Sequence, residues 1–448
     1  MHALKLAVAG AFAASAVTAQ AATYVLHAPA WGANQNAAVA KAGGLLRFSH
    51  DGAGVAVVES ANPNFLKAAL AGGAITGGAQ DLVVEWTKPV ANEALPDAIN
   101  PADDTFFSGV QWAPQAIEAP AAWAAGYTGR GVRVAVIDGG IFNAHPDLAP
   151  NMDTTLSRSF VPPAGISAAD DACRVQYNCD TGTFWHGTHV AGIVAAVDNA
   201  MGVVGIAPEA TIVGVKALHN GSGSFGSVIQ AILYASTTAR ADIINMSLGA
   251  VFPRGQRDGA ELTSALNRAV NFAARNGSLV VVSAGNDGLD MDHSGNWIVT
   301  PAESGNAIAV SATGPTNFAA GGTDFSNPAS YTNYGNSLVW VSAPGGDFDY
   351  PGNENCTRPT TTGSLTRPCW VFDMVLSTSR AGWSWAAGTS MAAPAASAVA
   401  ALIKQKHPGI SVGELKNRLA QSATDEGKNG QDNFHGRGFV NARNAVTQ

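Results

Sequence analysis

Five short apolar runs, separated by segments with helical character, constrain the fold of this chain more than any other feature. The runs are rich in Val and Ile and lack the alternation of polar and apolar residues that marks a half-exposed strand. Continuous apolar strands that alternate with helices indicate a parallel sheet buried on both faces. The sequence therefore predicts a three-layer α/β sandwich. The five runs span residues 132–137, 211–215, 242–246, 279–283 and 307–311.

Polar side chains stand at the carboxyl ends of three of these runs. Asp138 and Ser247 directly follow two runs, and Asn286 stands three residues after a third. The carboxyl ends of parallel strands lie at one edge of a sheet, and ligands of open α/β sheets bind at that edge. Two Ala-rich segments suited to helices open with His186 and Ser390. We expect all five residues to meet in one crevice.

Three of these residues form the set that a serine nucleophile requires. A serine hydroxyl attacks an amide only when a base takes its proton, and an imidazole does so best when a carboxylate fixes its tautomer. Asp138, His186 and Ser390 supply the carboxylate, the imidazole and the hydroxyl. The side-chain amide of Asn286 supplies a donor for the oxyanion that such an attack creates.

The residues around these side chains resemble the motifs of subtilisin-like serine proteases. The chain order Asp, His, Ser is the subtilisin order and differs from that of chymotrypsin and the α/β-hydrolases. The resemblance extends from about residue 110 to about residue 446 and includes the spacing between motifs. It implies the subtilisin-like three-layer sandwich and acyl transfer through Ser390. The motifs read Val-Ile-Asp138-Gly, His186-Gly-Thr-His189, Ser283-Ala-Gly-Asn286 and Gly388-Thr-Ser390-Met-Ala-Ala-Pro394.

The resemblance also assigns roles and marks one departure. It implies that His186 is general base and then acid, that Asp138 orients it, and that Asn286 and the backbone N–H of Ser390 bind the oxyanion. We expect His189, one helical turn after His186, to be a structural partner. Gly139 stands where the family usually has a Ser or Thr that donates a hydrogen bond to the catalytic carboxylate.

Substrate binding in the family uses two extended segments that pair with the peptide backbone. Because such pairing recognises main chain, it accepts almost any unfolded polypeptide. Small residues before Asn286 imply one wall of a roomy primary specificity pocket, with Asp287 near its floor, so we expect cleavage after Lys or Arg as well as after apolar residues. The matching segments are Gly221-Ser222-Gly223 and Ser247-Leu248-Gly249, and the wall is Ser283-Ala284-Gly285.

A structural calcium ion is a further expectation from the resemblance. Calcium takes six to eight oxygen ligands, which here would be side-chain and carbonyl oxygens of one loop and of the preceding Asp. Ser108 stands where the family has a Gln ligand. The alternative is a loop held by hydrogen bonds alone. The implied ligands are Asp147, Val197, Asn199, Met201 and Val203.

The chain begins with features of a secreted precursor. A lysine, a short apolar stretch and Ala19-Gln20-Ala21 predict a signal peptide over residues 1–21, because the stretch is shorter than a membrane span. Residues 22–86 predict a ferredoxin-like β-α-β-β-α-β domain. The resemblance implies a propeptide that helps the rest fold and inhibits it, and the alternative is an accessory domain. Residues 87–109 then predict an exposed linker with the maturation site, and 110–448 the catalytic domain.

Within residues 22–86 the pattern predicts individual elements. We expect strands over 24–27, 45–49 and 55–59, with a hairpin turn at Asp51-Gly52 between the last two. We expect helices over 34–42 and up to residue 70, and a final strand over 81–86.

The composition limits the classes of partner that the chain is expected to bind. The formal net charge is −8, only 13% of residues are charged and there is no basic run, so neither nucleic acid nor an anionic membrane is an expected partner. We expect a secreted, monomeric protein, either extracellular or periplasmic.

Four cysteines fall in two stretches that look inserted, about 160–183 and about 346–370. An even cysteine count in an exported chain favours disulfides, and the spacings do not suit a zinc site. Four cysteines allow three pairings. We favour the local one, Cys173 with Cys179 and Cys356 with Cys369, because each bridge would hold one loop.

The leading hypothesis is a secreted serine endopeptidase of broad specificity, made as a zymogen, that acts on polypeptide substrates and has its own propeptide as intramolecular inhibitor and chaperone. A processing protease with narrow specificity is a second hypothesis, suggested by the two inserted loops. A catalytically silent binding protein is a third, and the intact triad argues against it.

Overall fold

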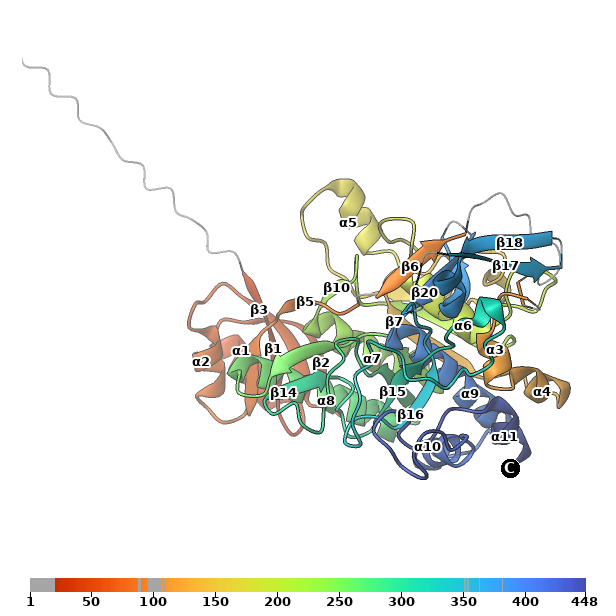
Figure 1. The fold of residues 1–448 in the computed structure, drawn as a ribbon. Helices are drawn as coiled ribbons and strands as arrows, with labels where there is room; N and C mark the ends of the chain where they lie inside the picture. Colours follow the sequence, from red (N-terminus) through yellow and green to blue (C-terminus); the bar gives the residue numbers. More distant parts are fainter. Residues whose placement is uncertain are drawn as a thin grey trace, which may run out of the picture.

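A parallel sheet of seven strands forms the centre of the main domain, residues 110–448 (Figure 1). The computed structural model describes residues 21–87, 90–95, 106–107, 109–349, 352, 354–361, 363–380 and 382–448. The strand order β16-β15-β13-β11-β7-β9-β8 confirms the predicted parallel sheet. The strands are β7 (Arg133–Asp138), β8 (Arg158–Ser159), β9 (Thr211–Lys216), β11 (Ile243–Met246), β13 (Leu279–Ser283), β15 (Ala307–Thr313) and β16 (Val341–Pro344).

Helices cover both faces of this sheet because both faces are apolar. Along β7, Val134 and Val136 belong to one buried cluster, whereas Ala135 and Ile137 belong to another. Full burial of each Val or Ile is worth about 1.5–3 kcal/mol. The first cluster packs beneath α6 (His186–Ala195) and α9 (Thr389–Lys406), the second beneath α7 (Phe225–Thr237) and α8 (Arg257–Arg275).

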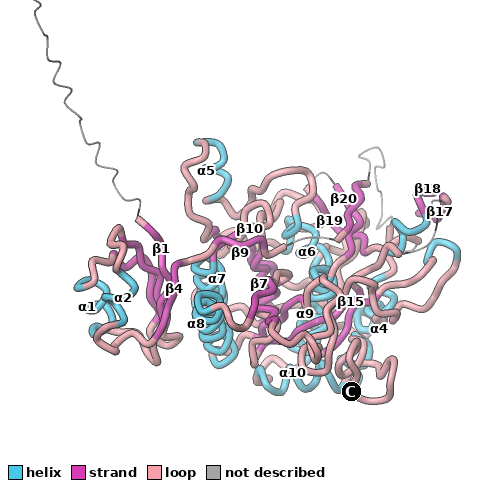
Figure 2. Tube along the Cα trace, turned by 60° about the vertical axis from the view of Figure 1, so that its left-hand side comes forward, coloured by secondary structure: helices cyan, strands magenta, loops and turns pink. Residues whose placement is uncertain are grey.

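The N-terminal domain, residues 22–80, is a small antiparallel sheet with two helices. Its strand order β2-β3-β1-β4 and its β-α-β-β-α-β succession agree with the predicted ferredoxin-like pattern. The two helices lie on the outer face, and the other face lies against α7 and α8 (Figure 2). The elements are β1 (Ala22–His27), α1 (Ala33–Lys41), β2 (Leu45–His50), β3 (Val55–Ser60), α2 (Phe65–Leu70) and β4 (Gly77–Gln80).

The segment after this domain runs along the main domain instead of finishing its own sheet. The predicted strand over 81–86 is wrong in its partner, because β5 (Val83–Glu85) pairs with β10 (Ser222–Ser224) of the main domain. Part of the predicted exposed linker is strand β6 (Ala91–Ala94), which pairs with β20 (Gly382–Ala387). The linker is also not exposed throughout, because Leu95 and Phe106 are buried. Residues 88, 89, 96–105 and Ser108 of the linker, and the predicted signal peptide up to residue 20, lie outside the described residues.

Short elements complete the fold. Both disulfides have the predicted local pairing, Cys173–Cys179 and Cys356–Cys369. No helix among the described residues is long and apolar enough to cross a membrane. The remaining helices are α3 (Ala113–Ala116), α4 (Ala119–Ala124), α5 (Ala168–Arg174), α10 (Val412–Gln421) and α11 (Ala442–Thr447). The remaining strands are β12 (Ala250–Pro253), β14 (Trp297–Thr300), β17 (Asn355–Thr360), β18 (Gly363–Pro368) and β19 (Val375–Ser379), and short 3₁₀ turns span Ala149–Asn151, Phe318–Ala320 and Cys369–Asp373.

Candidate active site

The carboxyl end of β7 and the first turn of α6 bring an acid and an imidazole together. Asp138 is the last residue of β7, and His186 is the first of α6. Nδ1 of His186 lies 2.9 Å from both carboxylate oxygens of Asp138, and both side chains are buried. Nε2 of His186 is buried without a hydrogen-bond partner among the described residues. A ring with Nδ1 held by a carboxylate can accept a proton on Nε2.

Ser390 lies in the first turn of α9, which packs against α6. Pro394, four residues later, has no N–H to donate to the carbonyl of Ser390. That carbonyl accepts a 2.7 Å hydrogen bond from the hydroxyl of Ser247 instead. The hydroxyl of Ser390 donates a long 3.3 Å hydrogen bond to the carbonyl of Ser247. This bond is weak at that length, and the Ser390 hydroxyl makes no hydrogen bond with Nε2 of His186 in this structure.

Asn286 and the start of α9 form a donor pair beside Ser390. The side-chain oxygen of Asn286 accepts hydrogen bonds from the backbone N–H of Thr389 at 2.9 Å and from its hydroxyl at 2.7 Å. With the oxygen held in this way, the amide nitrogen lies on the opposite side as a donor. The first N–H groups of a helix lack partners within the helix, so the N–H of Ser390 is a second donor.

His189 has the structural placement expected for it. Its side chain is fully buried, and Nε2 lies 2.9 Å from the carbonyl oxygen of Ser384 in β20. Burial lowers the pKa of His189 to about 3, so the ring stays neutral at physiological pH. His189 joins α6 to β20 and cannot replace His186 as the base.

Asp180 occupies the position left by the missing side chain at Gly139. A Cβ on Gly139 would lie 2.3 Å from Oδ2 of Asp180, which is too close. Asp180 accepts a 3.0 Å hydrogen bond from the N–H of Gly140 and a 2.9 Å bond from the N–H of Asn220. It therefore ties the loop after the catalytic acid to a predicted substrate-binding segment. Sequence reasoning missed Asp180, although the unusual glycine was a signal that another group fills this place.

A buried lysine stands behind this aspartate. Lys216, the partner of Asp138 in the sheet register, is fully buried and lies 4.0 Å from Asp180. Its ammonium group donates to the carbonyl of Cys179 in the disulfide loop. Burial lowers the pKa of Lys216 to about 8.

The cleft beside Ser390 has a volume of about 530 Å³ and contains a segment of the chain itself. The N–H and carbonyl of Trp86 pair with the carbonyl of Gly221 at 2.8 Å and the N–H of Gly249 at 3.0 Å. The indole of Trp86 donates to the carbonyl of Gly223 at 2.9 Å. The two predicted binding segments, 221–223 and 247–249, thus flank one extended strand.

The wall of the predicted specificity pocket is held by a buried asparagine. Asn333 donates to the carbonyl of Ala284 at 3.1 Å and accepts from the N–H of Asp287 at 3.0 Å. Gly285 has φ of 102°, and a Cβ there would lie 2.3 Å from Nδ2 of Asn333, so only glycine fits. Ser283, Gly285 and Asp287 line the cleft, and Asp287 is exposed.

The predicted calcium loop is closed by hydrogen bonds. Oδ2 of the buried Asp147 accepts from the N–H of Val203 at 3.2 Å and from the indole N–H of Trp383 at 2.8 Å. Asn199 donates its amide to the carbonyl of Pro146 at 3.3 Å. N–H groups directed at Oδ2 disfavour a cation at that oxygen. The calcium ion implied for Asp147, Val197, Asn199, Met201 and Val203 stays a prediction.

Comparison with known proteins identifies the family. The profile described as the subtilase family matches residues 129–438. The chain belongs to the subtilase family. M-protease of Shouchella clausii (strain KSM-K16) is 37% identical over 345 residues, which are 76% of this chain and 71% of that protein. Subtilisin Savinase of Lederbergia lenta is 37% identical over 340 residues, 75% of this chain and 98% of that protein. This subtilase is therefore a subtilisin-like serine endopeptidase.

The fold likeness includes the N-terminal domain. The epidermin leader peptide processing serine protease of Staphylococcus aureus matches with a TM-score of 0.75 and 21% identity. The match covers 95% of this subtilase and 99% of that chain. At this identity the likeness concerns the fold alone.

We expect Asp180→Ala to lower kcat/KM about tenfold, because Gly140 and Asn220 lose a shared anchor. Asp171→Ala, in the same loop but bonded only to Ala164 and Gly165, is the matched control. Gly139→Ser should lower kcat/KM much more when Asp180 is present than in the Asp180→Ala background, where the new side chain has room. Peptide hydrolysis kinetics test this, and equal damage in both backgrounds would contradict it.

Lys216 should make the protein more stable as pH rises from about 8 to 10.5. The folded state lowers the pKa of Lys216, so unfolding takes up a proton in this window and the free energy of unfolding increases with pH. The full change is about 3 kcal/mol. Urea unfolding of Ser390→Ala with and without Lys216→Met measures it. Parallel pH profiles of the two variants would refute the assignment.

We expect chelation to leave the calcium-type loop intact, because N–H donors already bind the carboxylate of Asp147. EDTA should change Tm of Ser390→Ala by less than about 2 °C. A larger fall, reversed by Ca²⁺ and not by Mg²⁺, would show that the loop rearranges to take calcium.

Proposed function

We propose that this subtilase is made as a secreted zymogen whose N-terminal domain is an inhibitory propeptide, and that Ser390 cleaves the junction after that domain. One observation carries the proposal: the strand between the two binding segments is residues 83–87 of the same chain. The next described segment also pairs with the main domain, since the N–H of Val90 donates to the carbonyl of Ala387. Thr87 and Val90 thus flank the proposed cut, and Val90 lines the same cleft as Ser390.

The proposed reaction is acyl transfer. His186 takes the proton of the Ser390 hydroxyl as its oxygen attacks the peptide carbonyl, while Asp138 stabilises the imidazolium. The amide of Asn286 and the N–H of Ser390 bind the oxyanion. The tetrahedral intermediate collapses as His186 gives the proton to the leaving amine, and an acyl-enzyme remains. Water, activated by the same imidazole, then releases the acid.

Contacts far from Ser390 support inhibition by the N-terminal domain. The carboxylate of Asp81 accepts from the N–H of Gly226 at 3.1 Å and so caps the start of α7. Nε2 of His27 lies 2.7 Å from the carboxylate of Glu261 on α8. Because these contacts do not involve the scissile segment, they persist after cleavage and keep a product strand in the cleft.

Main-chain pairing in the cleft supports broad specificity for unfolded polypeptides. The site in which the ring of Trp86 packs edge-on against Phe225 adds a preference for a bulky side chain upstream of the cut. The exposed carboxylate of Asp287 supports some cleavage after Lys or Arg.

A narrower processing role is the second candidate. Asp180 in the first disulfide loop contacts the binding segment at Asn220, so that loop can restrict substrates. The second disulfide loop packs instead against Gly109 and Phe318. A digest of denatured casein that yields only a few cuts would favour this role.

Autoprocessing gives a sharp test. We expect mass spectrometry of purified material to place the mature N-terminus at Lys88, Pro89 or Val90. Ser390→Ala should remain uncut and should lose labelling by a fluorophosphonate probe, because both need the hydroxyl. Ser236→Ala, a buried serine of α7 whose hydroxyl donates to the carbonyl of Leu233 in the same helix, is the control and should still be cleaved and labelled. A cut outside residues 87–90, or labelling of Ser390→Ala, would disprove the assignment.

A further inference from the structure

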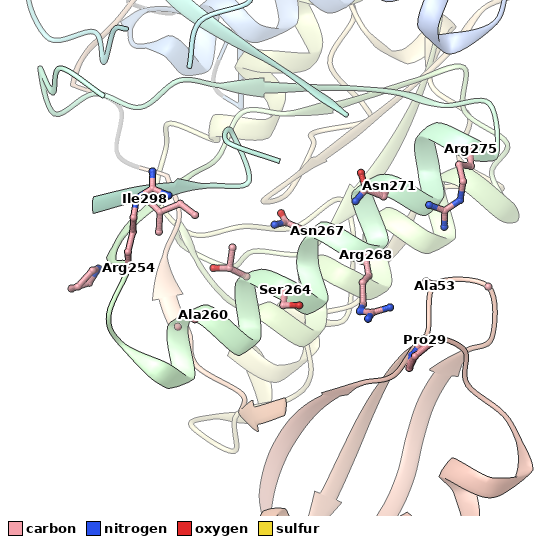
Figure 3. A pocket seen from close by; sticks show the side chains of 14 residues that line it. Pro29, Ala53, Arg254, Ala260, Ser264, Asn267, Arg268, Asn271, Arg275 and Ile298 are labelled. Atoms are coloured by element: carbon pink, nitrogen blue, oxygen red, sulfur yellow. The ribbon is translucent and has the colours of Figure 1, made fainter. Parts of the chain in front are cut away.

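A second cavity, separate from the cleft, lies between α8 and the N-terminal domain (Figure 3). Its volume is about 610 Å³. One wall is a polar face of α8, and the opposite wall consists of Pro29, Gly52 and Ala53 in loops of the N-terminal domain. Figure 3 shows the side chain of Arg268 extending from α8 toward the loop that carries Pro29.

The cavity is positively charged within an acidic protein. Three arginines line it and no Asp or Glu does, although the chain has a formal net charge of −8. Arg254 is already paired with Glu303 at 2.5 Å. Arg268 and Arg275, by contrast, make no ion pair or hydrogen bond with the described residues. Two unneutralised guanidinium groups facing one cavity favour an anion.

Uncharged donors stand on the same face of the helix. The side-chain oxygens of Asn267 and Asn271 accept bonds from Ser304 and Asn306, so both amide nitrogens are left as donors. The hydroxyl of Thr263, in a side chain that is 6% exposed, is buried without a partner. A buried polar group without a partner costs about 1–3 kcal/mol, and a ligand acceptor would remove that cost.

The spacing of the arginines indicates the shape of the ligand. Arg268 and Arg275 are seven residues apart, which is two helical turns or about 10 Å along the axis. Figure 3 shows the two side chains extending separately from α8, and in that arrangement a single compact anion does not bridge them. An elongated molecule with several acid groups can contact both, and the amides between them.

We propose that this cavity binds an elongated polyanion with phosphate or carboxylate groups, and that its occupancy holds the N-terminal domain on the catalytic domain. The second part rests on the proposed zymogen function. Because the two walls come from different domains, a ligand that touches both walls binds the docked domains more tightly than the separated domains. By linkage, the ligand then slows release of the N-terminal domain after cleavage.

The binding test uses the full chain with Ser390→Ala, in which cleavage cannot separate the walls. Calorimetry with tripolyphosphate and with a triglutamate peptide should give one site per chain for at least one of them. Binding of tripolyphosphate alone would identify a phosphorylated ligand, and binding of the peptide alone a carboxylated one. Inorganic phosphate, which is too short, should bind at least tenfold more weakly. Absence of binding by both probes would overturn the proposal.

Matched variants locate the site. Arg268→Gln and Arg275→Gln should each weaken binding at least tenfold without changing Tm. Arg257→Gln loses the same charge at the start of the same helix but outside the cavity, and should stay within twofold of the parent. Equal weakening in Arg257→Gln would show non-specific attraction and overturn the site.

The coupling to domain release has its own measurement. In the self-cleaving chain, saturating probe should slow dissociation of the N-terminal fragment at least fivefold, and Arg268→Gln should abolish this effect. An unchanged release rate would overturn the coupling. Failure to cleave would instead overturn the zymogen proposal and would leave the calorimetric result standing.

Discussion

Parallel pairing of β7 with β9 and β11 is the constraint on which the active site depends. All strands of a parallel sheet end at one edge, so side chains just beyond β7, β11 and β13 are brought together although they lie far apart in sequence. The helices α6 and α9 begin at the same edge, as the contacts of His186 with Asp138 and of Thr389 with Asn286 show. Their N-terminal ends add positive potential where an oxyanion forms. Apolar strands buried on both faces therefore fix the geometry of polar groups that contribute nothing to the core.

Those polar groups are buried, so each needs a hydrogen-bond partner that does not block its part in the reaction. Because Pro394 has no N–H, the carbonyl of Ser390 has no hydrogen bond within α9, and the hydroxyl of Ser247 donates to it instead. Asn245 in turn donates to the hydroxyl of Ser247 and accepts from the hydroxyl of Ser397. Asp180 solves a related problem for the loop after Asp138: a carboxylate from a disulfide-tied insertion fills the space beside Gly139 and accepts the N–H of Gly140, although it supplies no donor to Asp138. Burying this carboxylate requires a nearby positive charge, which Lys216 supplies. The unusual glycine, the inserted loop and the buried lysine are thus parts of one arrangement.

The strand runs, the parallel sheet, the triad residues and the disulfide pairing were predictable because each is encoded locally. Runs of Val and Ile indicate buried strands, and the short motifs with their spacing indicate the active-site residues. Residues 81–94 were misjudged because they have ordinary strand and linker patterns, whereas their partners, β10 and β20, lie more than 100 residues away. The roles of Asp180 and Asn333 could not be predicted for the same reason. In the sequence both are ordinary polar residues, and their roles arise only from tertiary contacts. The calcium loop matches the family in sequence, whereas the N–H donors that reach Oδ2 of Asp147 are visible only in the structure.

The antiparallel strand pair β12–β14 connects the cleft with the cavity on α8. Val251 and Phe252 line the cleft, and the next residues, Pro253 and Arg254, line the cavity. The N-terminal domain touches both sites, because its loops close the cavity and its outgoing strand fills the cleft. A ligand in the cavity and a peptide in the cleft therefore contact opposite ends of one short strand. β14 pairs with β12 along its whole length, so this strand is a direct structural link between the two sites.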